Sequence, residues 1–424
     1  MIWIMAVMPV VLLVLGFPIF LILLATSAIL VLFVMGVPAT QLHITMFGSV
    51  DKFALIAVPF FLFAGELMGR GGMSKRIVEC VLAAAGRIRG SLGITTVGAC
   101  TIFGALSGSG PATVAALGRL LYVPLRKAGY GERFSNGLLT SSGGIAVIIP
   151  PSIAMILYGA AAEQSVALLF VAGIIPGLLI AAMLGGYVYV YAARRGIREG
   201  QAFNAATFFR AIRDGIWALG MPVIVLGGIY AGIVSPTEAA GIACVYAIIV
   251  TRYVYRDIDW RGIWNVAVDS MYLTAQVLII VAAAGVFSWL LTVSGLPQGL
   301  VAWIGGLQLA PWMVLLAVNL LLLLVGCFLD PNSAILVLTP LLLPVMLAIG
   351  VDPIHFGIIM TVNLAIGMFT PPFGLNIFVA QAMFKTPIKE IYVGLLPFIA
   401  LNLVALMLVT YLPGLSLWLT RYAG

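Results

Sequence analysis

Two adjacent prolines stand in the middle of a long apolar segment, and no other feature limits the possible folds so strongly. The segment runs from about Phe134 to Ala162 and contains Gly143-Gly144 followed by Pro150-Pro151. Each proline lacks an N–H and collides with the preceding helical turn, so a membrane-spanning helix is predicted to break near its middle. Within hydrocarbon such a break is tolerated only where the freed backbone groups line a cavity or bind something.

The same pattern occurs a second time. Asn363 opens a stretch that leads through Gly367 to Pro371-Pro372 and Phe373. Two interrupted helices at corresponding places in the two halves of a chain indicate the binding site of a secondary transporter.

The composition supports a membrane protein. Of the 424 residues 63% are hydrophobic and 8% are charged, whereas soluble domains carry about 25% charged residues. The fold class predicted is therefore an all-α polytopic membrane protein. The net charge of +7 is attributed to loop lysines and arginines rather than to nucleic-acid binding. The chain has no Gly-Lys-Ser/Thr sequence, so no P-loop and no ATP hydrolysis by that route are expected.

Apolar segments divide the chain into spans and hairpins. Single or broken spans are predicted over residues 2–15, 18–36, 53–69, 134–162, 166–193, 216–234, 238–251, 270–294, 354–383 and 392–419. Two interrupted stretches, 92–124 and 312–347, turn at Ser107–Pro111 and Asp330–Ser333. Their arms are too short to span comfortably, so each stretch is predicted to be a re-entrant helical hairpin.

Basic residues orient these hairpins. Arg87, Arg89 and residues 126–133 flank the first hairpin with positive charge, whereas no Lys or Arg lies between Arg261 and Lys385. Because basic loops remain cytoplasmic, the first hairpin is predicted to enter from the cytoplasm and the second from outside. Eighteen of the 21 Lys and Arg residues then face the cytoplasm, in segments 70–89, 126–133, 194–213 and 252–261 and at Lys385 and Lys389.

The two halves match in order. Pro111 and Pro331 are 220 positions apart, and Pro150 and Pro371 are 221 apart. Hairpin, connection and broken helix recur in the same order, while the distribution of basic residues indicates opposite orientations in the membrane. An inverted-topology repeat is therefore predicted. An amphipathic helix at 74–89 and its counterpart Leu296–Leu309 precede the hairpins, as arms or as surface connectors. The predicted division is 1–91 (scaffold and arm), 92–193 (first transport half), 194–310 (scaffold and arm) and 311–424 (second transport half).

Several motifs resemble one family over nearly the whole chain. They begin at Val58, Gly104, Ile149, Ser235, Phe328, Asp352 and Thr370, and read VPFFLFAGELM, GALSGSGPATVAALG, IPPS, SPTEA, FLDP, DPIHFG and TPP. With them the chain resembles the large membrane (DctM-like) subunit of tripartite ATP-independent periplasmic (TRAP) transporters.

That resemblance implies a sodium-coupled importer of organic acid anions that moves its substrate by an elevator motion in the bacterial inner membrane. It also implies two partners, a small membrane subunit of about four helices and a periplasmic substrate-binding protein. Many relatives carry an aspartate at the first hairpin tip, where this chain has Thr113.

Each hairpin tip is predicted to face a broken helix and to form one sodium site. Sodium is a hard cation that prefers oxygen ligands, which unwound backbone supplies without formal charge. The predicted ligands of the first site are Ser107, Ser109, Gly143, Val147 and Pro150, and those of the second are Asp330, Asn332, Gly367, Phe369 and Thr370. Asp330 has two possible roles, sodium coupling or capping of the helix that follows it.

An anionic substrate is expected between the tips, because helix N-termini after the prolines direct N–H groups toward the midplane. Its predicted contacts are Ser107, Thr113, Ser152, Asn332 and Asn376. Arg119 lies two turns beyond the first tip and is expected to extend toward the cytoplasm rather than to the substrate. Two alternatives remain from these patterns, an ion or solute channel and a stand-alone secondary carboxylate transporter. Saturable uptake in fixed ratio with sodium distinguishes a carrier from a channel.

Overall fold

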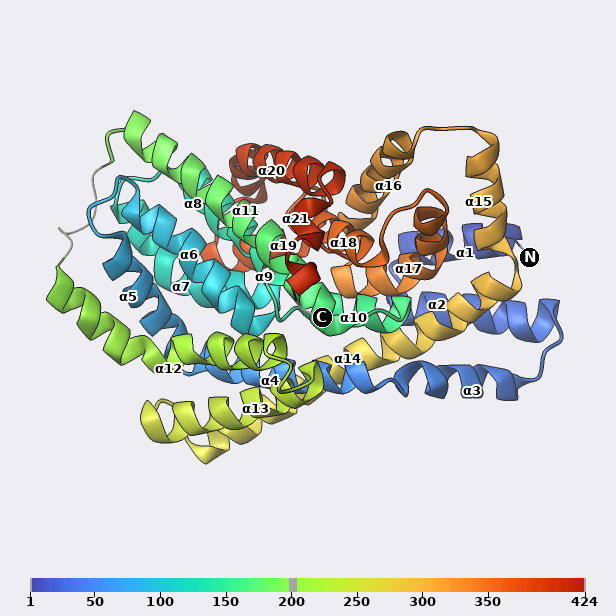
Figure 1. Cartoon of the computed structure of the whole chain (residues 1–424), viewed down its shortest axis with the longest axis horizontal. Coiled ribbons are helices and arrows are strands. Elements are labelled where there is room, and N and C mark those ends of the chain that lie inside the picture. Colours follow the sequence, from blue (N-terminus) through green and yellow to red (C-terminus); the bar gives the residue numbers. More distant parts are fainter. Residues whose placement is uncertain (1, 198–203, 423–424) are drawn as a thin grey trace.

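The computed structural model describes residues 2–197 and 204–422, and every regular element in these ranges is a helix (Figure 1). The first half comprises α1 Ile2–Val14, α2 Ile19–Ile29, η1 Leu30–Val34, α3 Ala39–Val50, η2 Phe53–Ile56, α4 Ala57–Arg70, α5 Met73–Ala85, α6 Ser91–Ser107, α7 Gly110–Lys127, α8 Glu132–Ser142, α9 Ile145–Ile148, α10 Ile153–Ala162 and α11 Val166–Arg194.

The second half repeats this order. It comprises α12 Ala205–Tyr230, α13 Pro236–Ile249, η3 Val250–Val254, α14 Trp260–Val293, α15 Leu296–Gly306, α16 Pro311–Gly326, α17 Pro331–Ala348, α18 Pro353–Gly367, α19 Leu375–Phe384 and α20 Ile388–Tyr411, followed by the short helices α21 Gly414–Leu417 and η4 Leu419–Tyr422. Both α2 and α13 end in a π-helical turn, η1 and η3, and the line α3–η2–α4 corresponds to the single long helix α14.

Length and hydropathy confirm a multi-pass membrane protein. Within the described ranges seven helices are long and apolar enough to cross a membrane, and the pair formed by α8–α9 and α10, bent by 40°, makes an eighth candidate. The predicted break in segment 134–162 is therefore present. Helix α17, one arm of the second hairpin, has 18 residues, which is the upper end of the predicted arm length, and it is one of these seven helices.

Several predicted boundaries were wrong. Residues 39–50 form α3. No helix was predicted there, because Gln41, His43 and Thr45 interrupt the apolar pattern. Helices α12 and α14 begin about ten residues earlier than expected, where Asn204 and Asp259 cap their N-termini. The last span ends at Tyr411 instead of residue 419, just before Pro413. Arg198, which was assigned to a basic cytoplasmic segment, lies outside the described residues.

Local chemistry explains the hairpin turns. Helix α6 ends at Gly108, which adopts the left-handed conformation (φ +58°) that glycine tolerates best. Ser109 then caps α7, which has Pro111 in its first turn, where a missing N–H costs nothing. In the second hairpin Asp330 caps α17, which starts with Pro331. Each hairpin thus turns through a few residues that provide both a helix end and a helix start.

The hairpins and broken helices form one unit, the hairpin body, which we define as α6–α11 and α16–α20. Its two halves interlock, since α7 packs on α19 and α17 packs on α10. Tyr122 stacks on Phe384 with ring centroids 4.4 Å apart, and the Tyr158 hydroxyl donates to the Pro353 carbonyl over 2.6 Å. The second arm of each hairpin therefore lies against the broken helix of the other half.

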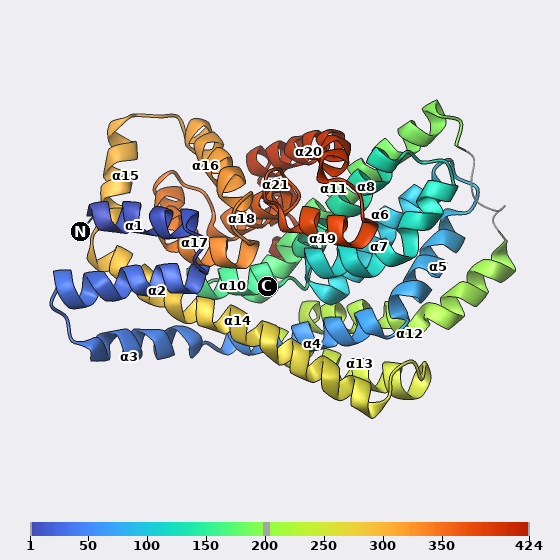
Figure 2. The same ribbon diagram turned by 180° about the vertical axis from the view of Figure 1, so that it is seen from behind.

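The remaining long helices form a second unit, the flanking bundle, defined as α1–α4 and α12–α14. Helices α3, α4, α13 and α14 run along the lower edge in Figures 1 and 2. Helix α14 packs on α2, α3 and α4, and α4 packs on α13. Arg70 and Asp269 join α4 to α14 through an ion pair of 2.6 Å. The contacts inside the bundle thus hold the helices of both halves together.

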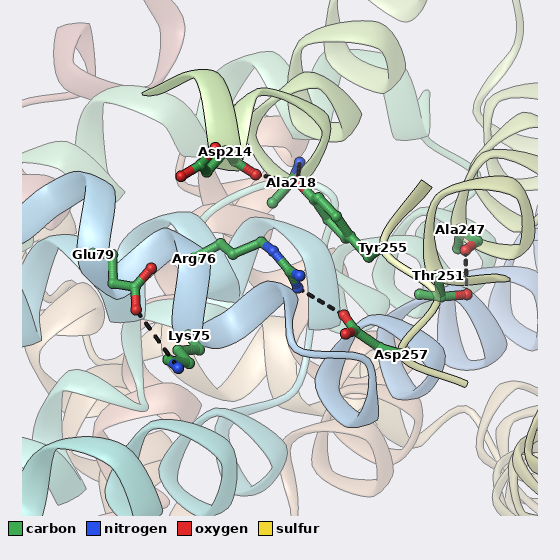
Figure 3. A network of polar contacts seen from close by, with 9 residues as sticks. All are labelled: Lys75, Arg76, Glu79, Asp214, Ala218, Ala247, Thr251, Tyr255 and Asp257. Atoms are coloured by element: carbon green, nitrogen blue, oxygen red, sulfur yellow. Dashed lines mark hydrogen bonds and ion pairs between the residues drawn. The ribbon is translucent and has the colours of Figure 1, made fainter. Parts of the chain in front are cut away.

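Helices α5 and α15 connect the two units at opposite ends of the long axis (Figures 1 and 2). Helix α5 packs on α12 of the bundle and on α6 of the body. Figure 3 shows how it is fixed to the bundle, with Arg76 paired to Asp257 at 2.6 Å. The Arg76 guanidinium also lies 3.7 Å from the ring centroid of Tyr255, whose hydroxyl donates to the Asp214 carbonyl. Glycines Gly86 and Gly90, both at positive φ, separate α5 from the first hairpin.

Candidate functional site

The first hairpin tip lies directly on the first helix break. Gly110 at the start of α7 is so close to Gly143 that a Cβ on Gly110 would lie 3.2 Å from the Gly143 carbonyl oxygen. A Cβ on Gly108 would similarly lie 3.2 Å from the Pro151 carbonyl oxygen. Residues 141–152, which include the break, are all buried. Glycine is needed here because the two backbones approach without room for side chains.

The second tip and the second break repeat this arrangement. Gly326 at the end of α16 lies against Gly367 at the end of α18, so that a Cβ on Gly326 would lie 3.2 Å from the Gly367 Cα. Phe328 and Phe373 pack beside this contact with ring centroids 5.4 Å apart. Pro372 and Phe373 are exposed, in contrast to the buried first break. Each break thus meets the hairpin of its own half.

The two breaks also meet each other. The Phe369 ring lies against Gly144, where an added Cβ would be 2.6 Å from Phe369 Cε1. Asn376, in the first turn of α19, crosses to the other half and donates from Nδ2 to the Thr140 carbonyl over 3.3 Å. Its amide also lies beside Gly110 and Gly143. Backbone carbonyls and hydroxyls from the two halves, together with the side-chain amide of Asn376, therefore converge at the centre of the hairpin body.

Comparison with known proteins decides the family. Residues 6–415 match the family model of the tripartite ATP-independent periplasmic transporter, DctM component. The chain belongs to this DctM family. It is 41% identical over 384 residues to the C4-dicarboxylate TRAP transporter large permease protein DctM of Pseudomonas aeruginosa, covering 91% of this chain and 90% of that protein.

Other DctM relatives carry different substrate names. The chain is 40% identical over 417 residues to the ectoine/5-hydroxyectoine TRAP transporter large permease protein UehC of Ruegeria pomeroyi, covering 98% and 97% of the two chains. It is 41% identical over 373 residues to the isethionate TRAP transporter permease protein DctMQ of Oleidesulfovibrio alaskensis, covering 88% of this chain and 59% of that longer relative. These relatives are transporter permeases and not enzymes.

A solved structure shares the fold. The YdaH transporter of Alcanivorax borkumensis superposes with a TM-score of 0.63 at 17% sequence identity, and the match covers 96% of this chain and 98% of that one. At this identity the likeness concerns the fold alone.

Two predicted ligands of the first sodium site, Ser107 and Ser109, lie together in this DctM-family chain. The Ser107 hydroxyl is 3.0 Å from the Thr113 hydroxyl, and Thr113 Oγ1 donates to the Ser109 carbonyl over 2.9 Å. The Ser152 hydroxyl donates to the Val147 carbonyl over 2.5 Å, which occupies one lone pair of that oxygen. The Ser109 hydroxyl accepts only a long hydrogen bond from the Ala112 N–H, 3.5 Å, whereas the Ser109 carbonyl accepts from both the N–H and the hydroxyl of Thr113, so the hydroxyl is the freer of its two oxygens.

In the predicted second site the Thr370 N–H donates to the Gly367 carbonyl over 3.0 Å. The Thr370 hydroxyl donates to the Ile366 carbonyl over 2.7 Å, and Asn332 is half-buried in the first turn of α17. No hydrogen bond in the part of the chain that the structure describes joins Asn332 to Ser107, Thr113, Ser152 or Asn376. The exposed Arg119 side chain lies on α7, beyond the tip.

Sequence reasoning missed a buried polar chain that ties the second half together. Asn363 Nδ2 donates to Asn319 Oδ1 over 2.6 Å, and Asn319 Nδ2 donates to Thr410 Oγ1 over 3.1 Å. His355 Nε2 lies 3.2 Å from the Thr410 carbonyl oxygen. A lone asparagine in an apolar helix, as at Asn319, requires such partners, and this was the available signal. These hydrogen bonds connect α16, α18 and α20.

Asp330 has the geometry of a helix cap. Its carboxylate accepts the Ser333 N–H over 3.2 Å and the Ser333 hydroxyl over 2.5 Å. We expect Asp330→Asn to leave the sodium dependence of uptake unchanged, since asparagine caps nearly as well as aspartate. Asp330→Ala should lower the stability by about 1 kcal/mol, measured as a lower midpoint temperature in detergent. A sodium requirement that shifts in Asp330→Asn while the midpoint temperature stays unchanged would instead identify a coupling carboxylate.

Proposed function

We propose that this chain is the large permease subunit of a sodium-coupled TRAP transporter that imports an organic acid anion. The observation that carries the proposal is the convergence of two hairpin tips and two helix breaks, with Phe369 against Gly144 and Asn376 beside Gly110 and Gly143. Such unwound backbone provides carbonyl oxygens for sodium and N–H groups for an anion. The family membership supports transport, and the relatives named for C4-dicarboxylates and isethionate support an organic anion.

We infer that the hairpin body moves as a unit while the flanking bundle stays fixed, and that α5 and α15 connect the two. The interlocked helices of the body and the Arg70–Asp269 pair of the bundle support this division. The positions of the two hairpins toward opposite ends of the molecule (Figure 1) support an inverted repeat, and the basic segments support a cytoplasmic location for the α5 end. The bacterial inner membrane is the proposed location.

The proposed partners are a small membrane subunit of about four helices and a periplasmic binding protein. The relative named DctMQ, which is longer than this chain, supports the first partner, and the family description supports the second. Exposed apolar side chains on the flanking bundle, among them Phe33, Phe47 and Trp264, are suited to lipid or to the small subunit. The cargo is proposed to be delivered by the binding protein, and sodium to be co-transported without ATP.

Reconstitution tests this proposal. The chain, the small subunit and the binding protein would be placed in proteoliposomes, after a thermal-shift screen has identified the ligand of the binding protein among succinate, isethionate, ectoine and sugar acids. We expect saturable uptake only with all three components and an inward sodium gradient. An inside-negative potential should accelerate uptake if net positive charge enters, because each charge gains about 2.3 kcal/mol per 100 mV. Uptake by the chain alone, or without sodium, would contradict the proposal.

A further inference from the structure

Lys52 joins the two units at a place where the flanking bundle is interrupted. It lies between α3 and η2, whereas the corresponding helix α14 runs unbroken from Trp260 to Val293. Lys52 Nζ donates to the Ala160 carbonyl, in the last turn of α10, over 2.6 Å. It also lies 3.9 Å from Glu163 Oε1. The basic segments place this end of α10 on the outer side of the membrane, opposite the end where most lysines and arginines are expected.

The ammonium group of Lys52 has bonding capacity to spare. A lysine carries three N–H donors, and the Ala160 carbonyl accepts one of them. The carboxylate of Glu163 is too distant for a hydrogen bond, and its side chain is 86% exposed, so it neutralises the lysine weakly. Lys52 itself is only 35% exposed. A partly buried positive charge with two available donors is therefore present at the boundary between bundle and body.

A cavity of about 240 Å³ lies beside this charge. It is lined by Lys52, by Ser288, Trp289 and Thr292 of α14, and by apolar residues of α10 and α17. The hydroxyl hydrogens of Ser49 and Thr292 are directed to backbone carbonyls, so the groups of the lining that can donate to a ligand are the Lys52 ammonium, the Ser288 hydroxyl and the Trp289 indole N–H. The volume equals that of about eight water molecules at about 30 Å³ each, which is enough for a small organic acid.

The cavity is close to the candidate site. Its α17 wall consists of Leu336 and Pro340, which follow Asn332 by four and eight residues. At 1.5 Å per residue this separation is about 6–12 Å along the helix axis. A ligand in the cavity would therefore lie within about two helical turns of the second hairpin tip, on its outer side.

We propose that this cavity is an outer binding site for the carboxylate of an organic anion, held by the Lys52 ammonium and the Ser288 hydroxyl before the anion reaches the broken helices. The proposal rests on the proposed function, in that it takes the cargo to be an organic anion. A bound carboxylate would use the two available donors of Lys52 and would leave its hydrogen bond to the Ala160 carbonyl in place.

Charge-selective labelling tests the site without requiring transport. Thr292 is exposed and lines the cavity, and the four cysteines are buried and would be replaced by serine or alanine. The Thr292→Cys variant in nanodiscs would be treated with two thiosulfonate reagents in turn. One carries an anionic sulfonate group and the other a cationic trimethylammonium group. Each rate is first divided by the rate of the same reagent with a free thiol. On this scale we expect the anionic reagent to react about tenfold faster than the cationic one, owing to the nearby unit charge. Succinate should slow this reaction, and succinamide should not.

Matched variants assign the effect to Lys52. Lys52→Met should abolish both the reagent preference and the succinate protection, whereas Lys52→Arg, which keeps the charge, should retain the preference. Lys385→Met is the control, since Lys385 follows the second half-helix α19 and lies far from the cavity in the predicted topology. An unchanged preference in Lys52→Met, or a preference without succinate protection, would overturn the proposal. Failure of sodium-driven uptake with protection intact would refute the proposed function and leave the outer site standing.

Discussion

Asn376→Leu is expected to raise the sodium concentration for half-maximal uptake by about tenfold or more, which corresponds to about 1.4 kcal/mol of lost binding. Asn376 is fully buried, and its Nδ2 donates to the Thr140 carbonyl. Its Oδ1 is buried without a hydrogen-bond partner among the described residues and lies beside Gly110. A buried amide oxygen in this position suits a sodium ion that also contacts the first tip. Leucine has a similar size and lacks both polar atoms.

Asn402→Leu provides the matched control. Asn402 is also buried, but its Nδ2 donates to the Phe398 carbonyl one turn earlier in the same helix, over 2.8 Å. Its loss should change the sodium requirement little. The measurement is initial uptake against sodium concentration with the binding protein in excess. Equal sodium curves for the two variants would exclude Asn376 as a ligand and would confine the site to backbone and hydroxyl oxygens.

The helix breaks and hairpins could be predicted because their causes are local. Paired prolines remove N–H groups and obstruct the helix wherever they stand, and Gly108 and Asp330 end or start helices by their own conformational and capping preferences. The recurrence of the proline positions further predicted the order of elements in the second half. These conclusions needed no knowledge of which segments touch.

The contacts between the halves could not be predicted in the same way. Asn376 was assigned to the substrate, yet its hydrogen-bond partner Thr140 lies 236 positions earlier in the chain. The contacts of α7 with α19 and of α17 with α10 depend on how the two halves of the chain fold against each other. Lys52 is one of the three basic residues outside the eighteen that were assigned to the cytoplasm, and its partner Ala160 offers a backbone carbonyl, which no sequence pattern reveals.

Three ion pairs allow a direct test of relative motion. Lys52 and Glu163 join the flanking bundle to the hairpin body, Arg70 and Asp269 lie within the bundle, and Arg133 and Glu390 join α8 to α20 within the body over 2.6 Å. Each pair would be replaced by two cysteines in the chain without its own cysteines. A bifunctional thiosulfonate that reaches across both side chains would then link each pair, and reducing agent would release it.

Uptake in proteoliposomes that contain all three components is the decisive measurement, with each uncrosslinked double variant as its own reference. If the hairpin body carries the substrate past a fixed bundle, the 52–163 crosslink should reduce sodium-driven uptake to background, and reduction should restore it. The 70–269 and 133–390 crosslinks should leave uptake at the reference rate, because neither joins parts that move apart. Full uptake by the 52–163 crosslinked protein would contradict the account.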